Sequence, residues 1–263
     1  MIATAHPISD SMTMLRRRLL HLRRYPALTI MLVGQPVLFL LLLVSVFGGT
    51  LGNGLGAGVG GRKEYLHFIV PGILVIAVAS VAVGTAVAVA MDMTGGIINR
   101  FRTMAIAPSA VLTGHVLGSV TQSALAVGVS AAVAVAVGYR SDAGLADAAM
   151  ATLVLAMLAL SLTWLTVAFG LAAKSVESAS NLPMVLVLLP FLGSGFVPTD
   201  SMPAGLRWFA EHQPFTVVID ALRGLLDGAA SSRDVASALA WCTVLAVLGW
   251  RLSVGRYARE RAG

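Results

Sequence analysis

Charged residues are scarce in this chain. They make up 11% of its 263 residues, and hydrophobic residues make up 57%, whereas soluble domains are about 25% charged. Charge-free stretches such as 28–61 and 103–139 exceed the ~20 apolar residues that cross a bilayer core. We therefore predict an all-α integral membrane protein with a single transmembrane domain over 1–263, which leaves no room for a separate soluble catalytic domain.

Cysteine, histidine and lysine are also rare. The single cysteine, Cys242, excludes an internal disulfide framework, and the five scattered histidines show no metal-ligand spacing. A phosphate-binding P-loop requires GxxxxGK[ST], but Ala173 precedes Lys174 and Glu64 follows Lys63. We expect no metal and no cofactor in this chain. The net charge of +6 comes from basic residues at segment ends, so no nucleic-acid partner is expected.

The apolar runs predict six membrane spans. Their approximate ranges are 27–47, 66–91, 110–139, 145–173, 181–197 and 235–254, and a glycine-rich loop is expected over 48–61. Six spans place both termini on one side, and twelve of the eighteen basic residues fall on that side. The positive-inside rule therefore predicts cytoplasmic termini. Richness in Ala, Val and Gly, with many more Arg than Lys, favours a bacterial inner membrane.

Two cytoplasmic segments are predicted to be amphipathic. In the interface helix over 1–25, Arg16, Arg17 and Arg18 stand among leucines, a pattern typical of a helix lying on the membrane surface. In the segment over 92–108, apolar residues alternate with arginines on a short helix, which could be a docking surface. Its apolar members are Ile97, Ile98, Phe101 and Met104, and its arginines are Arg100 and Arg102.

The stretch over 198–230, between the fifth and sixth spans, is predicted to be an outer hairpin. It contains two short helical patterns, about 204–211 and 215–226, separated by Gln213 and Pro214. Each is too short and too charged to cross the membrane. We favour a re-entrant hairpin that buries Leu206, Phe209, Phe215, Val218 and Leu222 and leaves Arg207, Asp220 and Arg223 paired or near water. The alternative is an amphipathic hairpin on the surface.

Two motifs resemble signatures of type-2 ABC exporter permeases, especially the daunorubicin-resistance branch. The first is D-x-x-x-G-x-x-x-R-F-R-x-M over 92–104, which resembles the family's coupling-helix region. The second is F-V-P-x-x-x-M-P-x-x-L-R-x-F-A-x-x-Q-P over 196–214, followed by D-A-L-R over 220–223. The chain departs from the family at Ala105, where Pro is common, and at Pro108, where Arg is common.

The resemblance implies a permease subunit of an ATP-driven exporter. Two permeases, copies or paralogues, would form the pore in the lipid bilayer, and each would clasp a separate ABC ATPase that binds Mg-ATP. The exported substrate would be a hydrophobic drug, natural product or lipid.

Three sets of candidate residues follow. The ATPase-coupling set is Ile97, Arg100, Phe101, Arg102, Met104, Arg16, Arg17 and Arg18. The substrate-path set is Phe39, Asn181, Phe191 and Phe196. The outer-hairpin set is Met202, Pro203, Trp208, Pro214, Asp220 and Arg223.

Two other functions stay open at this point, an intramembrane enzyme and a channel or structural protein without an energy source. Ser194, flanked by Gly193 and Gly195, could be a serine nucleophile, but the last span has no histidine to act as its base. Close helix packing explains these small residues better.

Overall fold

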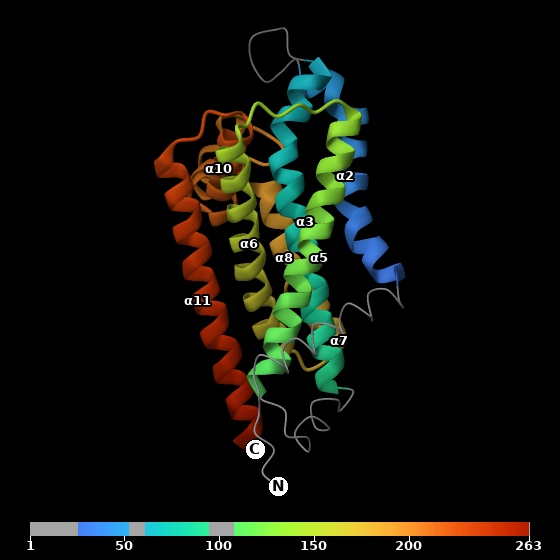
Figure 1. Cartoon of the computed structure of the whole chain (residues 1–263), viewed down its shortest axis with the longest axis vertical. Helices are drawn as coiled ribbons and strands as arrows, with labels where there is room; N and C mark the ends of the chain where they lie inside the picture. Colours follow the sequence, from blue (N-terminus) through green and yellow to red (C-terminus); the bar gives the residue numbers. More distant parts are fainter. Residues whose placement is uncertain (1–25, 53–60, 95–107, 263) are drawn as a thin grey trace.

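The computed structural model describes residues 26–52, 61–94 and 108–262, and every element in these ranges is helical. The helices form an elongated bundle (Figure 1). Five of the described helices are long and apolar enough to cross a membrane. They are α2 (Pro26–Gly52), α3 (Gly61–Thr94), α5 (Pro108–Val137), α6 (Leu145–Ala172) and α11 (Ser232–Ala262). The glycine-rich stretch expected to be a loop from residue 48 is helical as far as Gly52.

The expected fifth span is not one continuous helix. The apolar stretch begins earlier than expected and covers 176–192, as α7 (Val176–Asn181), α8 (Met184–Leu188) and the 3-10 helix η1 (Leu189–Leu192). Pro183 and Pro190 lack the N–H that an uninterrupted α-helix needs, and the chain becomes extended at Gly193. The prediction of a single helix over 181–197 was therefore wrong. The proline and glycine residues interrupt the helix in spite of the apolar run.

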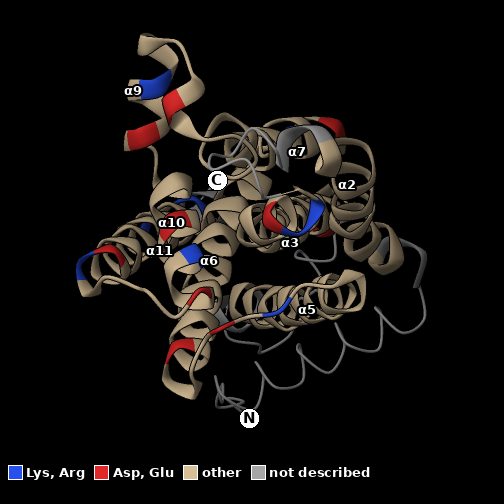
Figure 2. Cartoon of the chain, turned by 90° about the horizontal axis from the view of Figure 1, so that it is seen from above, with Lys and Arg blue, Asp and Glu red and all other residues tan. Residues whose placement is uncertain are grey.

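α3 is the central helix of the bundle. It contacts α2, α5, α6, α7 and α10, and Figure 2 shows it surrounded by its neighbours. Its side chains are buried along nearly the whole length from Tyr65 to Ala90. Because lipid is as apolar as these side chains, van der Waals packing rather than escape from water holds such helices together.

Small residues let the helices approach closely. A Cβ at Gly170 of α6 would lie 2.6 Å from the Ala86 carbonyl oxygen of α3, and one at Gly249 of α11 would lie 2.6 Å from the Leu165 nitrogen of α6. Two hydrogen bonds reinforce the pairing of α6 and α11. Ser253 Oγ donates to the Trp164 carbonyl at 3.0 Å, and Arg256 Nη1 donates to the Ala168 carbonyl at 3.0 Å.

Gly170→Ala should destabilise the bundle by about 1–3 kcal/mol, because its methyl group would overlap the α3 backbone and force the two helices apart. Gly128→Ala is the matched control: Gly128 is also within a long helix, and a Cβ there meets nothing within 4 Å. Apparent melting temperatures of the detergent-solubilised variants test this. A midpoint for Gly170→Ala equal to that of Gly128→Ala would contradict the close approach.

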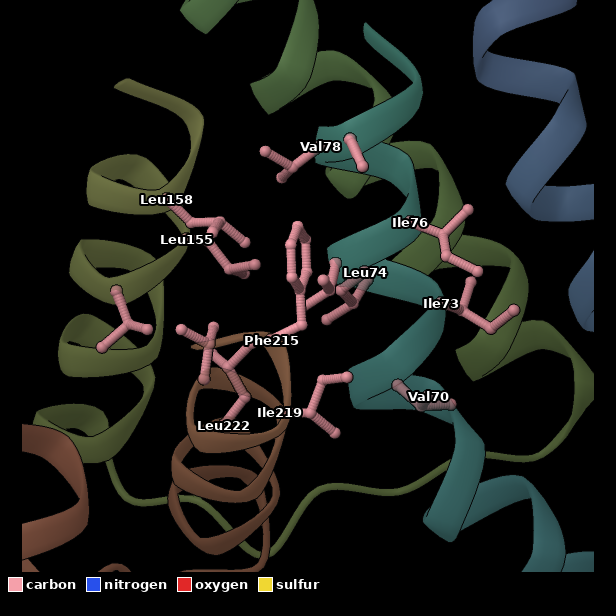
Figure 3. Close-up of a cluster of buried hydrophobic side chains, with 14 of the residues drawn as sticks. Val70, Ile73, Leu74, Ile76, Val78, Leu155, Leu158, Phe215, Ile219 and Leu222 are labelled. Carbon is pink, nitrogen blue, oxygen red and sulfur yellow. The ribbon is translucent and has the colours of Figure 1, made fainter. Parts of the chain in front are cut away.

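α10 (Pro214–Leu226) and α9 (Ala204–His212) form the predicted hairpin. Phe215, Ile219 and Leu222 of α10 are buried against α3 and α6, and Phe215 lies between Leu155 and Leu74 (Figure 3). α9 projects from the bundle (Figure 2). Leu206 and Phe209 of α9 are 40% and 41% exposed, so the rest of the chain does not cover them, and their burial in the outer leaflet stays a prediction. α9 contacts α10 and the short helix η2 (Thr199–Ser201), which do not cover that apolar face.

Candidate functional site

Arg223 is the centre of a polar cluster at the end of the bundle that carries the hairpin. It lies one turn after Asp220 on α10. Its Nη1 donates to Asp220 Oδ1 at 2.6 Å, so of the two arrangements expected for these charges, paired or near water, the structure shows the pair. Its Nη2 donates to the Ser194 carbonyl at 2.6 Å and to the Phe68 carbonyl at 3.3 Å.

Ser194 and Phe68 complete this outer cluster, which we define as Phe68, Ser194, Asp220 and Arg223. Ser194 Oγ donates to Asp220 Oδ1 at 2.6 Å, and the Arg223 guanidinium lies over the Phe68 ring, 4.3 Å from its centroid. Only 21% of the Arg223 side chain is exposed. Burial lowers the pKa of its guanidinium, and the Asp220 charge opposes that shift. Arginine stays charged at any physiological pH, so its charge-assisted hydrogen bonds link α10 permanently to α3 and to the segment after η1.

The segment that contains Ser194 is held by further contacts. Ser194 N donates to Thr216 Oγ1 at 3.4 Å, and Gln213 Nε2 donates to the Leu189 carbonyl at 3.0 Å. A Cβ at Gly72 would lie 2.7 Å from the Gly195 carbonyl oxygen. The small residues therefore allow α3 and this segment to touch, as the packing interpretation predicted, and the Ser194 hydroxyl serves as a hydrogen-bond donor to a carboxylate.

The remaining hairpin candidates lie away from the outer cluster. Met202 and Pro203 connect η2 to α9, and Pro214 begins α10. Trp208 is 65% exposed and stacks on His212 with ring centroids 4.9 Å apart. Arg207 of α9 pairs with Asp200 and Glu211 at the surface.

Three of the four substrate-path candidates come together. Phe39 of α2 meets Phe191 edge to face at 5.6 Å, and Phe191 stacks on Phe196 at 4.4 Å. Asn181 is the fourth candidate. It is exposed at the end of α7, before the segment that contains Phe191 and Phe196. The three rings form a continuous aromatic contact between α2 and the broken helix, which is the segment made of α7, α8 and η1.

The coupling candidates Ile97, Arg100, Phe101, Arg102 and Met104, together with Arg16, Arg17 and Arg18, lie outside the described residues. The two helix ends that flank the 92–108 segment are described. There Asp92 Oδ2 of α3 lies 3.0 Å from His115 Nε2 of α5. Sequence reasoning missed this contact, although both residues lie near the same ends of adjacent antiparallel spans.

These features define a polytopic helical membrane protein, with long apolar helices, a broken helix and a short hairpin packed at one end. Comparison with known proteins specifies the class. Residues 10–226 match the ABC-2 type transporter family, so the chain belongs to that family. As a permease of this family it is the membrane component, and ATP hydrolysis takes place in a separate partner subunit.

Two relatives support the assignment. The chain is 29% identical to the daunorubicin resistance ABC transporter permease protein DrrB1 of Streptomyces coeruleorubidus, over 99% of this chain and 90% of that protein. It is 24% identical to the probable doxorubicin resistance ABC transporter permease protein DrrC of Mycobacterium tuberculosis, over 82% of this chain and 79% of that protein. The resemblance inferred from the two motifs is confirmed. The family also sets aside the enzyme and the non-energised channel as functions.

Proposed function

We propose that this permease moves a hydrophobic drug or drug-like natural product out across a bacterial cytoplasmic membrane. The observation that carries the proposal is its relationship, along 261 residues, to a permease named for daunorubicin resistance. An apolar bundle with an aromatic contact between α2 and the broken helix suits such a substrate. A second permease, a copy or a paralogue, would complete the pore. The test is ATP hydrolysis by the partner ABC ATPase reconstituted with this permease, and daunorubicin should stimulate that hydrolysis.

In this proposal, the energy of ATP hydrolysis in the ATPase reaches the permease through the segment over 92–108. Phe101 and its apolar neighbours would fill a groove on the ATPase, and Arg100 and Arg102 would contact acidic groups beside it. The Asp92–His115 contact supports this assignment, because it holds together the two helices from which the segment emerges. The arginines at 16–18 would place a second helix on the same face of the membrane.

The proposed topology has six crossings, with residues 176–192 as the fifth and with cytoplasmic termini. In Figure 1 the Pro26 end of α2 and the Ala262 end of α11 are the lower ends of their helices, as an even number of crossings requires. The nine residues of α9 and the thirteen of α10 span only about 14 and 20 Å, short of the ~30 Å hydrocarbon core. The hairpin is therefore proposed to enter the outer leaflet and return.

Cysteine labelling tests this topology. Cys242 is buried and is first replaced by Ser. In that background a cysteine in place of Ala57 should react with an impermeant maleimide added to intact cells. A cysteine in place of Arg259 should react only after the cells are opened, because the basic ends stay inside. The reverse pattern at either position would show that the assigned orientation is wrong.

A further inference from the structure

Two polar contacts join α3 to α5 near the ends from which the segment over 92–108 leaves the bundle. Asp92 Oδ2 lies 3.0 Å from His115 Nε2, and Thr85 Oγ1 donates to Ser119 Oγ at 2.8 Å. Thr85 and Asp92 are seven residues apart on α3, and His115 and Ser119 are four apart on α5, so each two share a face of their helix. The two contacts therefore lie along one line, which we call the α3–α5 seam.

The two contacts of the seam hold different parts of the bundle. Ser119 Oγ also lies 3.0 Å from Thr163 Oγ1 of α6, and the three hydroxyl residues are at most 1% exposed. This contact therefore fixes three helices to one another inside the bundle. The Asp92–His115 contact lies closer to the end of α3 and to the beginning of α5. It fixes the two points from which the segment over 92–108 starts and returns.

The Asp92–His115 pair is a poor source of stability. Only 20% of the Asp92 side chain and 9% of the His115 side chain are exposed, and a buried polar pair often stabilises no more than apolar side chains of similar volume. Among the described residues, His115 Nδ1 is buried without a hydrogen-bond partner, which adds a cost that an apolar residue avoids. The pair is better explained by the geometry that it imposes.

The apolar side chains around the pair do not impose that geometry by themselves. Val89 of α3 and Leu112 and Val116 of α5 belong to one buried cluster. Apolar burial is non-directional, whereas a hydrogen bond between Nε2 and Oδ2 restricts both distance and direction. The pair therefore sets the position of the α3 end against the beginning of α5.

We propose that Asp92 and His115 are positioning residues for the docking of the ABC ATPase. The inference rests on the proposed function, since it takes the segment over 92–108 as the ATPase-binding segment. It deepens that function by naming the residues that fix the ends of this segment. Because the ends are already fixed, binding the ATPase does not have to pay for ordering them. Neither residue needs to contact the ATPase.

The dissociation constant of the permease–ATPase complex tests this role. The permease in phosphatidylcholine–phosphatidylglycerol nanodiscs is titrated with its purified partner ATPase. His115→Ala and Asp92→Ala should each weaken binding about three- to tenfold, because the cost of ordering the helix ends returns. The double variant should bind no more weakly than the weaker-binding single variant, since either substitution already breaks the pair. His115→Gln should bind nearly as tightly as the wild type, because its amide can still donate to Asp92.

Ser119→Ala is the matched control. It removes the other contact of the seam, including the link to Thr163, but leaves the Asp92–His115 pair in place. It should lower the apparent melting temperature and leave the dissociation constant of the complex at the wild-type value. A merely structural role of the pair would instead make the loss of affinity follow the loss of stability in all the variants.

Four results would overturn the proposal: wild-type affinity of both alanine variants, losses that multiply in the double variant, no recovery in His115→Gln, or an equal loss in Ser119→Ala. The titration needs no drug, so it separates this inference from the proposed function. The expected affinities together with ATP hydrolysis that daunorubicin does not stimulate would support the pair and contradict the proposed substrate. A wild-type permease that binds no ABC ATPase would contradict both.

Discussion

Replacing Arg223 with Ala should destabilise the permease by about 2–4 kcal/mol and free the hairpin from α3. The substitution leaves Asp220 without its cation and removes the donor to the Ser194 and Phe68 carbonyls, in a place where only 21% of the Arg223 side chain is exposed. Losing one partner of a largely buried, hydrogen-bonded charge pair costs several kcal/mol, and the 47% exposure of Asp220 moderates that cost. The measurement is the apparent melting temperature in detergent.

Two variants make the Arg223 experiment specific. Arg207→Ala removes a guanidinium that pairs with two acids, Asp200 and Glu211, but on the exposed surface of α9, where such pairs contribute about 0–1 kcal/mol. Its melting temperature should stay close to that of the wild type. Arg223→Lys keeps the charge but cannot reach Asp220 and both carbonyls together, so it should fall between wild type and Arg223→Ala. Equal stability of Arg223→Ala and Arg207→Ala would rule out the outer cluster as the anchor of α10.

Phe101→Ala should reduce the affinity for the ATPase by about 1–3 kcal/mol, because it removes the aromatic anchor of the proposed coupling helix. The paired change Arg100→Ala/Arg102→Ala should also weaken the complex, through the loss of charge-assisted hydrogen bonds. Both variants should keep a wild-type melting temperature. Co-purification of the ATPase and daunorubicin-stimulated ATP hydrolysis measure the effect.

The alternative for the two arginines is that they merely follow the positive-inside rule. Under that alternative, Phe101→Ala leaves the complex and its stimulated turnover intact. If both variants retain the ATPase and full stimulation, the coupling assignment fails. The segment with Arg16, Arg17 and Arg18 would then be the next candidate for coupling to the ATPase.

Much of the bundle could be predicted from the sequence, because the membrane imposes long charge-free runs on every full span. The predicted span at 145–173 corresponds to α6, which ends at Ala172. Asp220 and Arg223 were expected to be paired or near water, and the structure pairs them, since residues three apart share a face of a helix. Local rules of this kind depend on residues that are close in the chain.

The other contacts could not be predicted, because they depend on how distant segments pack. The two carbonyls that accept from Arg223 belong to Phe68 and Ser194, and a main-chain acceptor leaves no trace in the sequence. The exposure of Phe209 depends on which elements cover α9, a tertiary fact. The break at Pro190 and Gly193 was visible as breaker residues, but the apolar run outweighed them in the prediction.

ATP-dependent accumulation of daunorubicin in inverted membrane vesicles tests the central claim most directly. The vesicles contain this permease and its partner ABC ATPase, and the controls omit the permease or carry an ATPase that cannot hydrolyse ATP. An exporter with cytoplasmic termini should concentrate the drug inside the vesicles only when both proteins are active and ATP is supplied. Accumulation that is the same without the permease, or without ATP hydrolysis, would contradict its assignment as the membrane subunit of an ATP-driven drug exporter.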